Sequence, residues 1–133
     1  MAETKIKPEQ GLSASTARFK IISATRDMTA ATADVAYTGV GFKPAAIIAM
    51  AAINSTVEYS MGFADAGGTT GNLYDGSSSA NMAVDGNFLT LWAAAGGAQT
   101  GTLKSLDSDG FTMTWTKYLT PTGTVTIRFI CFR

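Results

Sequence analysis

The last quarter of this chain alternates apolar and polar side chains with a period of two, which is the pattern of β-strands. The apolar positions of a first run are Phe111, Met113 and Trp115, and those of a second run are Val125, Ile127, Phe129 and Cys131. Thr112, Thr114 and Thr116 occupy the alternate positions of the first run, so they face the other side of the strand. Turn-forming residues precede each run, at positions 105–110 and 121–123. The C-terminal region is therefore predicted to form two strands, each with one buried face.

Shorter runs of the same kind occur earlier in the chain and are separated by Gly, Pro, Asn or Asp. They cover residues 19–24, 33–37, 45–53, 57–64 and 88–93. Many short strands at this spacing are typical of a sandwich or a barrel, and no segment has an amphipathic helical period. We predict an all-β fold, an antiparallel, jelly-roll-like β-sandwich over residues 18–133, preceded by a short extended N-terminal arm over residues 1–17. A short helix is the alternative for the alanine-rich run at 45–53, and residues 28–32 could form a helical turn.

The run at 57–64 alternates clearly, so one of its sides has to be assigned to the core. The larger apolar side chains are expected to face inward, and they are Val57, Tyr59, Met61 and Phe63. Glu58, Ser60 and Gly62 then face outward. A glycine on the outer face would let another backbone or subunit come close, and a β-bulge explains it equally well.

Two segments between these runs have no strand pattern. Residues 65–87 are rich in Gly, Ser, Thr and Asn, and a loop of that length in a compact domain is usually functional or mobile. Residues 94–99 are rich in Gly and Ala. We predict a long irregular loop for the first segment and a flexible connection for the second.

Charge is scarce in this chain, and it is balanced. Ten basic and ten acidic residues cancel, and only 15% of the residues are charged while 46% are hydrophobic. This balance favours neither nucleic acid nor an anionic membrane as a partner, and the longest apolar run, at 45–53, is too short to span a bilayer. The surface must be rich in Thr, Ser, Ala and Gly, which is typical of a surface that other subunits cover, because interface centres are depleted in Lys, Glu and Asp. The composition favours a homo-oligomer, with a compact alanine-rich monomer as the alternative.

The residues that build most active sites are missing here or are placed in turns. Without histidine the chain cannot form a Ser/His/Asp or Cys/His site, and it lacks the commonest metal ligand. A catalytic pair of carboxylates remains possible. Most acidic residues, however, sit beside glycine or in turns, where aspartate side chains form hydrogen bonds with the nearby backbone. Examples are Asp75, Asp85, Asp107 and Asp109. Cys131 is the one cysteine, and its apolar neighbours indicate an inert buried thiol. We predict a protein that is not an enzyme and binds no cofactor.

Several segments resemble ligand loops but lack the residues that complete them. Residues 107–110 begin like a calcium loop, yet the twelfth position counted from Asp107 is Tyr118 instead of glutamate, so a plain Asp-Gly turn is favoured. Residues 39–44 and 67–71 lack the Lys followed by Ser or Thr of a phosphate loop. We interpret them as a turn and a loop.

Aromatic rings with polar neighbours could form a platform for a sugar. The candidate rings are Tyr37, Tyr74, Trp92 and Tyr118, and the candidate polar partners are Asn72, Asp75 and Asn87. Packing in the core or between subunits is the favoured interpretation, because most of these rings follow strand alternation. Tyr74 is the exception, since it lies in the irregular segment at 65–87.

Three segments of the chain carry a resemblance. They are Tyr-Thr-Gly-Val-Gly-Phe-Lys-Pro-Ala-Ala-Ile-Ile at 37–48, Tyr-Ser-Met-Gly-Phe-Ala-Asp at 59–65, and Ser-Leu-Asp-Ser-Asp-Gly-Phe-Thr-Met-Thr-Trp at 105–115. Together they resemble a group of small β-rich virion proteins of tailed bacteriophages, over residues 37–133. Proteins of this group occur as capsid decoration or cement proteins, head fibres and distal modules of tail fibres. The resemblance therefore implies a non-enzymatic role in assembly or adhesion, in a virion assembled in the host cytoplasm.

Among these locations the capsid is favoured, because the chain begins with Met1 and a short arm, whereas a long shaft normally precedes a tail-fibre tip. The expected protein is a capsid cement or decoration protein that forms a trimer and contacts the major capsid protein or other virion proteins. The basic residues expected to pair with acids on the capsid protein are Lys5, Lys7, Arg18 and Lys20. The alternative is a tail-fibre or head-fibre adhesion module that binds a host glycan or surface protein. Its receptor loop would carry Asn72, Tyr74, Asp75 and Asn87.

Overall fold

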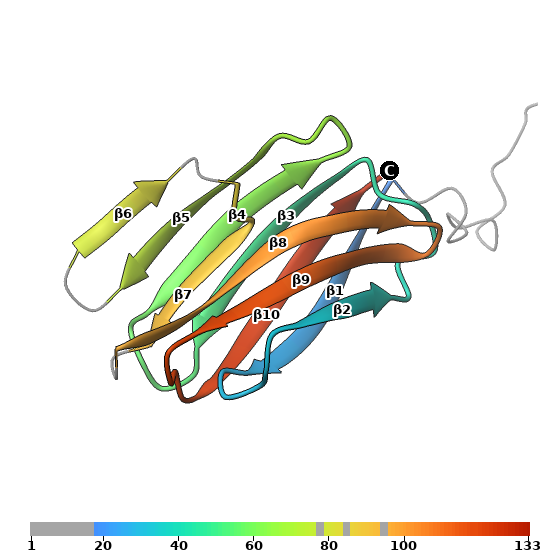
Figure 1. Cartoon of the computed structure of the whole chain (residues 1–133). Coiled ribbons are helices and arrows are strands. Elements are labelled where there is room, and N and C mark those ends of the chain that lie inside the picture. The colour runs from blue at the N-terminus through green and yellow to red at the C-terminus, as the bar shows by residue number, and fades with distance from the viewer. Residues whose placement is uncertain (1–17, 77–78, 84–85, 94–95) are drawn as a thin grey trace, which may run out of the picture.

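The protein consists of two antiparallel β-sheets packed face to face, with no helix among the described residues (Figure 1). The computed structural model describes residues 18–76, 79–83, 86–93 and 96–133. The strands of the larger sheet, in pairing order, are β1 (Phe19–Asp27), β10 (Thr124–Phe132), β3 (Ala46–Ile53), β4 (Tyr59–Asp65), β5 (Thr70–Gly76) and β6 (Ser79–Ala83). Those of the smaller sheet are β2 (Ala33–Thr38), β9 (Gly110–Tyr118), β8 (Gly97–Asp107) and β7 (Leu89–Ala93). The predicted antiparallel β-sandwich is confirmed, and the predicted arm over residues 1–17 lies outside the described residues.

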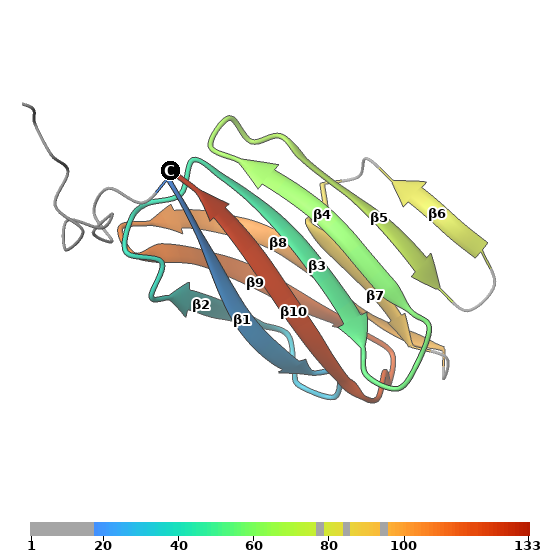
Figure 2. The same ribbon diagram turned by 180° about the vertical axis from the view of Figure 1, so that it is seen from behind.

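The chain winds so that its first two strands lie beside its last two. β1 pairs with β10 in the larger sheet and β2 pairs with β9 in the smaller one, which is a jelly-roll-like course. Between them, β3 to β6 form a meander in the larger sheet, and β7 to β9 form a meander in the smaller sheet. Figure 2 shows the larger sheet from its outer side. Each sheet therefore has one face toward the core and one face directed outward.

The core between the sheets contains the apolar faces that the C-terminal strands were predicted to bury. The fully buried side chains of β9 and β10 are Phe111, Met113, Trp115, Val125, Ile127, Phe129 and Cys131. Tyr37 is part of this core and not of a platform, because its ring centroid lies 4.8 Å from that of Phe129 and its hydroxyl accepts a 2.9 Å hydrogen bond from Trp115 Nε1. Burial raises the pKa of the Cys131 thiol to about 11, so the prediction of a buried thiol is confirmed.

A buried polar network joins the two sheets where β1 connects to β2. Gln99 of β8 is fully buried, and its Nε2 donates to the carbonyl oxygens of Met28 at 2.8 Å and Ala30 at 2.9 Å. Its Oε1 accepts a 2.5 Å hydrogen bond from Arg26 Nε. The connection is a turn held by this side chain, and the helical turn considered there does not form. Residues 97–99 belong to β8, so the predicted flexible connection is wrong for them, while residues 94–95 lie outside the described ranges.

Carboxylates at the β8–β9 turn accept hydrogen bonds from the chain itself. Asp109 accepts from the backbone N–H groups of Gly41 at 2.6 Å and Gly39 at 3.1 Å, and these bonds lower the pKa of its carboxyl group. Asp107 accepts from two neighbouring hydroxyls, at 2.7 and 2.8 Å, which lowers its pKa as well. These contacts confirm that residues 107–110 form a turn in which aspartate serves the local structure.

Two strands, β5 and β6, occupy much of the segment for which we predicted a long loop, so that prediction is wrong there. The segment has poor strand formers such as Gly71 and Asn72. It forms a strand because the edge of β4 offers a row of backbone N–H and C=O groups, with which β5 pairs, and β6 then pairs with β5. The alanine-rich run is the strand β3, which rules out the helix alternative.

β4 faces the opposite way from the prediction. The side chains directed to the core are Glu58, Ser60 and Ala64, together with the Cα of Gly62, whereas Val57, Tyr59, Met61 and Phe63 are exposed. The reason is that the chain entering β7 crosses the inner face of β4, where a Cβ on Gly62 would lie 1.6 Å from the carbonyl oxygen of Phe88. Ser60 beside it accepts a 3.1 Å hydrogen bond from the backbone N–H of Thr90. The close backbone approach expected at Gly62 does occur, but on the inner face and within the same chain.

Candidate functional site

The outer face of the larger sheet carries large apolar side chains that nothing within the described chain covers. Eight of them, from β1, β3, β4 and β10, are each exposed by between 37% and 56%. They are Phe19, Ile21, Ile48, Met50, Tyr59, Met61, Phe63 and Phe132. We call this set the apolar face. It lies on the side of the molecule that Figure 2 presents, opposite the smaller sheet.

The register of the strands arranges the apolar face in adjacent rows across the sheet. One row consists of Ile21, Ile130, Ile48 and Phe63, on four neighbouring strands. The next row consists of Ser23, Arg128, Met50, Met61 and Leu73, on five strands. Directly opposed residues have Cβ atoms about 5 Å apart, so their side chains touch along each row. The apolar face is therefore continuous along the first row, while Ser23 and Arg128 limit the apolar part of the second row to Met50, Met61 and Leu73.

Two details give the apolar face its relief. The Phe63 ring lies over Gly71 of β5, where a Cβ would stand 2.9 Å from the ring atom Cζ. Between β10, β3 and β4 there is a depression of about 290 Å³, whose lining includes Met50, Tyr59 and Met61. A surface with a projecting ring and a neighbouring hollow can interdigitate with another apolar surface, as packed sheets do.

The size of the apolar face is close to that of a protein interface. With roughly 200 Å² for a large apolar side chain, the eight exposed fractions leave on the order of 700 Å² of apolar surface. The largest apolar patch on a typical monomer is about 300–600 Å², and a specific interface buries about 800 Å² on each partner. The apolar face therefore exceeds what an ordinary monomer exposes and fits one side of a subunit contact.

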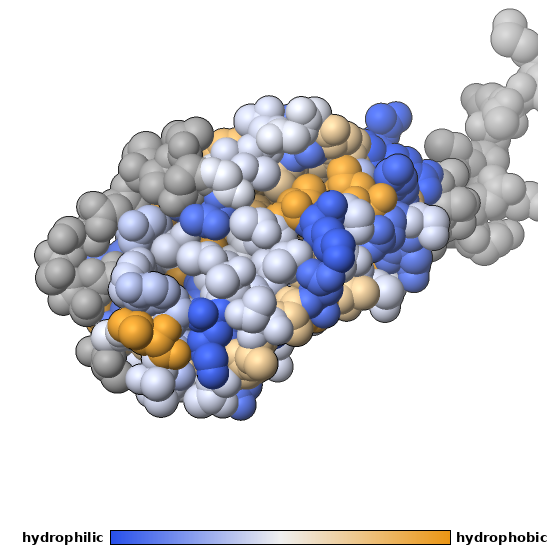
Figure 3. Space-filling view, viewed as in Figure 1, coloured by the Kyte–Doolittle hydropathy of each residue, from blue (hydrophilic) through white to orange (hydrophobic). Residues whose placement is uncertain are grey.

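A second candidate site lies on the outer face of the smaller sheet, on the opposite side of the sandwich. It is a depression of about 310 Å³ lined by Tyr74, Asn87, Thr90, Trp92, Ala98, Thr100, Thr116 and Tyr118. Figure 3 shows this side of the molecule, where pale, weakly polar residues lie between separate blue ones. Three of the four rings considered for a sugar platform come together here, with one of the three polar partners, Asn87.

The other residues predicted for a receptor loop lie elsewhere. Asn72 is buried, and its Nδ2 donates a 2.7 Å hydrogen bond to Thr90 Oγ1. Asp75 lies opposite Tyr59 in register, so it belongs to the outer face of the larger sheet. Asn72, Tyr74 and Asp75 are all part of β5. The four residues therefore do not share one loop, although Tyr74 and Asn87 do meet at the depression, and their contact with a receptor stays a prediction.

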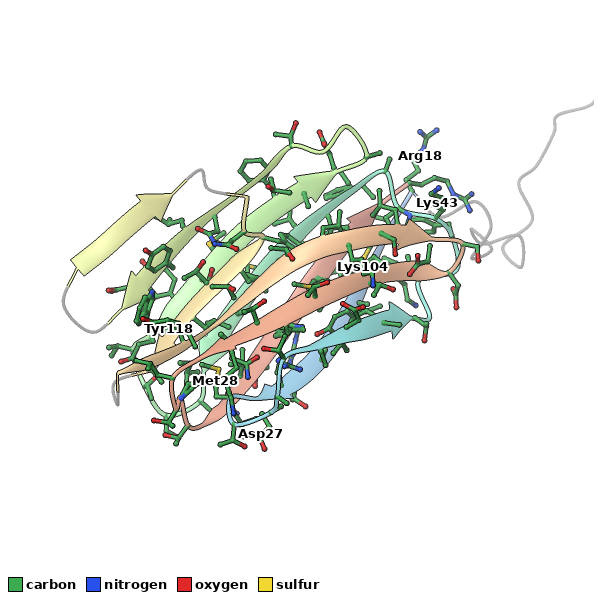
Figure 4. All side chains as sticks on the ribbon, viewed as in Figure 1. Arg18, Asp27, Met28, Lys43, Lys104 and Tyr118 are labelled. Carbon is green, nitrogen blue, oxygen red and sulfur yellow. The ribbon has the colours of Figure 1, made fainter. Side chains whose placement is uncertain are left out.

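Two of the four basic residues predicted to contact a capsid are described, and they lie at one end of the sandwich. Arg18 and Lys20 are exposed, and Figure 4 shows Arg18 and Lys43 at the same end. Lys5 and Lys7 lie outside the described residues. Contact of these residues with a capsid protein stays a prediction.

The described ranges contain neither a metal-binding cluster nor a candidate membrane-spanning helix. There, no group of three or more Asp, Glu or Cys side chains is placed to hold a metal ion. The same ranges include no helix of the length and apolarity needed to cross a membrane. The absence of enzymatic activity and of a cofactor stays an expectation from the sequence.

The apolar face is the feature that sequence reasoning missed, and β3 contained the signal for it. That strand is apolar at nearly every position, with Ile47 and Ala49 facing the core and Ile48 and Met50 facing outward. A strand that is apolar on both sides is typical of a sheet covered on both sides. Because the smaller sheet covers only one side, the second cover has to come from outside this sandwich.

The fold defines a two-sheet antiparallel β-sandwich with a candidate interaction surface on each outer face. No protein-family model matches this chain, and no curated protein or solved structure matches it either. A functional hypothesis for this chain therefore depends on the chemistry of the two surfaces themselves.

Proposed function

We propose that this protein is a non-enzymatic structural subunit of a bacteriophage virion, most specifically a capsid cement or decoration protein that forms a homo-oligomer, with a trimer as the form that the resemblance implies. The observation that carries the proposal is the apolar face, which has the size and chemistry of a subunit contact. The resemblance of residues 37–48, 59–65 and 105–115 to small virion proteins supports the proposal that the assembly is a bacteriophage virion.

A second copy of this chain suits the apolar face well. The contact centres of homo-oligomers are more apolar than other interfaces and are depleted in charge, as this surface is. Arg128 of β10 and Asp75 of β5 lie on opposite sides of it, and Asp27 and Asp65 lie at the ends of β1 and β4. Two copies placed face to face in opposite directions bring such opposite charges toward each other, which fixes the orientation of the contact.

Stabilisation of a shell by such a subunit follows from mass action. A protein that binds only the assembled shell lowers the free energy of that state, and each bound copy adds to the effect. Joining subunits into an oligomer raises the effective concentration of each remaining contact, so weak individual contacts give a stable whole. Arg18 and Lys20, exposed at one end of the sandwich, would then orient the oligomer on acidic residues of the capsid protein.

The oligomer is tested by light scattering on the full chain after size-exclusion chromatography. We expect an oligomer for the wild type and a folded monomer for Met61→Lys, because the ammonium group would be buried without a partner. Ala36→Lys is the matched control: Ala36 is exposed on the edge strand β2, outside the apolar face, and this variant should remain oligomeric. A monomeric wild type, or equal dissociation of both variants, would contradict the proposed contact.

The location on the particle is tested by the copy number of this protein in purified virions. A cement protein occurs in numbers comparable to the major capsid protein, whereas an adhesion module of a tail or head fibre occurs in a few copies. The double variant Arg18→Ser/Lys20→Ser should keep the oligomer but cosediment less with capsids. A low copy number would support the adhesion alternative, and its absence from virions would contradict both.

A further inference from the structure

The depression on the outer face of the smaller sheet is produced by the register of three strands. Trp92 of β7, Ala98 of β8 and Tyr118 of β9 are consecutive partners across the sheet. Ala98 is small and almost completely buried, and it separates the two ring-bearing positions along the row. Tyr118, labelled in Figure 4, is 58% exposed, and Trp92 is 36% exposed. Both rings therefore offer exposed surface to a ligand in this depression.

The planes of the two rings are steeply inclined to each other. Their centroids are 6.3 Å apart and their planes are inclined by 68°, which is an edge-to-face contact between the two rings. Tyr74 of β5 borders the same depression from the larger sheet. Flat aromatic faces at an angle can contact a ring-shaped ligand that has apolar C–H groups on its faces and polar groups on its rim.

A row of hydroxyl groups lies beside the row of rings. Thr90, Thr100 and Thr116 are consecutive partners on β7, β8 and β9, two residues from Trp92, Ala98 and Tyr118 respectively. The Thr90 hydroxyl accepts a hydrogen bond from Asn72, which leaves its own hydrogen available to donate. A hydroxyl can donate and accept, which matches a ligand whose rim consists of hydroxyl groups.

The described lining of the depression carries no charge. None of the eight described residues that line it is charged. Lys117 is next to Thr116 and Tyr118 in the chain, but its Nζ donates to the carbonyl oxygen of Thr29 at 3.1 Å. Among the described lining residues, a phosphate, sulfate or carboxylate would find no cation, and an ammonium group would find no carboxylate. The volume of about 310 Å³ is at the lower end of the range of about 300–1,000 Å³ for small-molecule sites.

We propose that this depression binds a neutral saccharide, with one or two sugar rings held against Trp92 and Tyr118 and their hydroxyl groups on the threonine row. The site is independent of the proposed oligomer, because it lies on the opposite face of the sandwich. Subunits joined through the apolar face would present it outward in several copies. Several shallow sites on one particle bind a repeated glycan far more tightly than one site does.

The test uses the full chain and a panel of neutral and acidic sugars. The neutral probes are lactose, maltose, cellobiose and N,N′-diacetylchitobiose, and the acidic probe is sialyllactose. Binding is measured by the fluorescence of the chain, because Trp92 is exposed while Trp115 is buried. Amide signals of β7 to β9 in a ¹H–¹⁵N spectrum locate the site. We expect at least one neutral probe to shift both signals at millimolar concentration, with a smaller response to the acidic one.

Three variants relate that response to the depression. Thr100→Val removes one hydroxyl at nearly constant shape and should weaken binding by roughly 2- to 10-fold. Trp92→Ala should weaken it by about tenfold or more. Thr102→Val is the control, because Thr102 is two residues further along β8 and does not line the depression. An equal loss in the control would overturn the assignment.

Two further outcomes would overturn the proposal. One is no response to any neutral probe while the spectrum shows a folded wild type. The other is a response of the same amide signals to a proline-rich peptide alone, since aromatic grooves also bind such peptides. Neither outcome affects the oligomer, whose test uses the opposite face.

Discussion

Replacing Gln99 by methionine should destabilise this sandwich more than any change of an exposed polar residue. Gln99 joins β8 to the connection between β1 and β2, and its amide makes hydrogen bonds to Met28, Ala30 and Arg26 at 2.8, 2.9 and 2.5 Å. Methionine keeps the length and approximate shape of glutamine but offers none of these bonds. Two carbonyl oxygens and one guanidinium N–H then lose their partner.

The magnitude follows from the burial of the partners that remain. A buried polar group left without a hydrogen bond costs about 1–3 kcal/mol, and a charged one costs more. Three such groups give about 4–6 kcal/mol, and the more apolar methionine side chain offsets about 1 kcal/mol of this. The free energy of unfolding should therefore fall by about 3–5 kcal/mol, which is a large part of the roughly 5–15 kcal/mol that is usual for a domain.

The assay is equilibrium unfolding in urea, followed by the fluorescence of Trp115, which is fully buried and lies 5.0 Å from the Arg26 guanidinium. With a slope of about 2 kcal/mol per molar urea, the midpoint should fall by about 2 M. All variants are compared at one protein concentration, because association with a second copy raises the apparent stability.

Lys104→Met is the matched control on the same strand. Lys104 forms an ion pair with Asp34, and the two side chains are 54% and 44% exposed. Exposed pairs of this kind contribute about 0–1 kcal/mol, so the midpoint should move by less than about 0.5 M. The reasoning from buried partners is refuted if Gln99→Met lowers the free energy of unfolding by less than about 1 kcal/mol, or if the control variant lowers it as much as Gln99→Met does.

Three further predictions concern single residues. Gly62→Ala should lower the melting temperature strongly, because the added Cβ would lie 1.6 Å from the Phe88 carbonyl oxygen. Gly86→Ala is the control and should change the melting temperature little, because a Cβ there would meet nothing within 4 Å. Similar melting temperatures of the two variants would show that the chain entering β7 does not cross β4 at Gly62. Asp109 has its pKa lowered from 3.8 by the N–H groups of Gly41 and Gly39, so its stabilising effect is present above pH 3.8 and is lost as the pH falls below it. The stability of the Asp109→Asn variant should therefore depend less on pH below pH 3.8 than that of the wild type. The same pH dependence of unfolding in both proteins would contradict the hydrogen bonds to Asp109. Cys131, with a pKa of about 11, should react with iodoacetamide at pH 8 only after unfolding, and equal labelling of native and unfolded protein would disprove its burial.

The sequence was sufficient for the strands whose two faces differ in polarity. In β9 the threonines alternate with Phe111, Met113 and Trp115, so the buried side is evident from the chain alone, and the structure confirms it. β5 could not be predicted in this way, because its glycine and asparagine residues favour turns and its strand depends on pairing with β4.

The second candidate site shows a similar limit. Tyr74, Trp92 and Tyr118 could be singled out by residue type, but they are far apart in the chain. Only the register of β7, β8 and β9 places Ala98 between two of the rings. Sequence alone therefore supplied the candidates, while their assembly into one depression depends on non-local pairing.

The inverted orientation of β4 connects the failed prediction to the proposed function. Alternation shows that Tyr59, Met61 and Phe63 share a face, but it does not say which face is covered. The crossing of the chain that enters β7 at Gly62 leaves room only for small side chains on the inner face there, so the large residues stand on the outer face. A monomer would gain from small or polar residues at those outer positions, because exposed apolar surface promotes association. Their presence in a chain that otherwise buries its large residues is best explained if a second surface covers them, and the Met61→Lys variant tests that explanation directly.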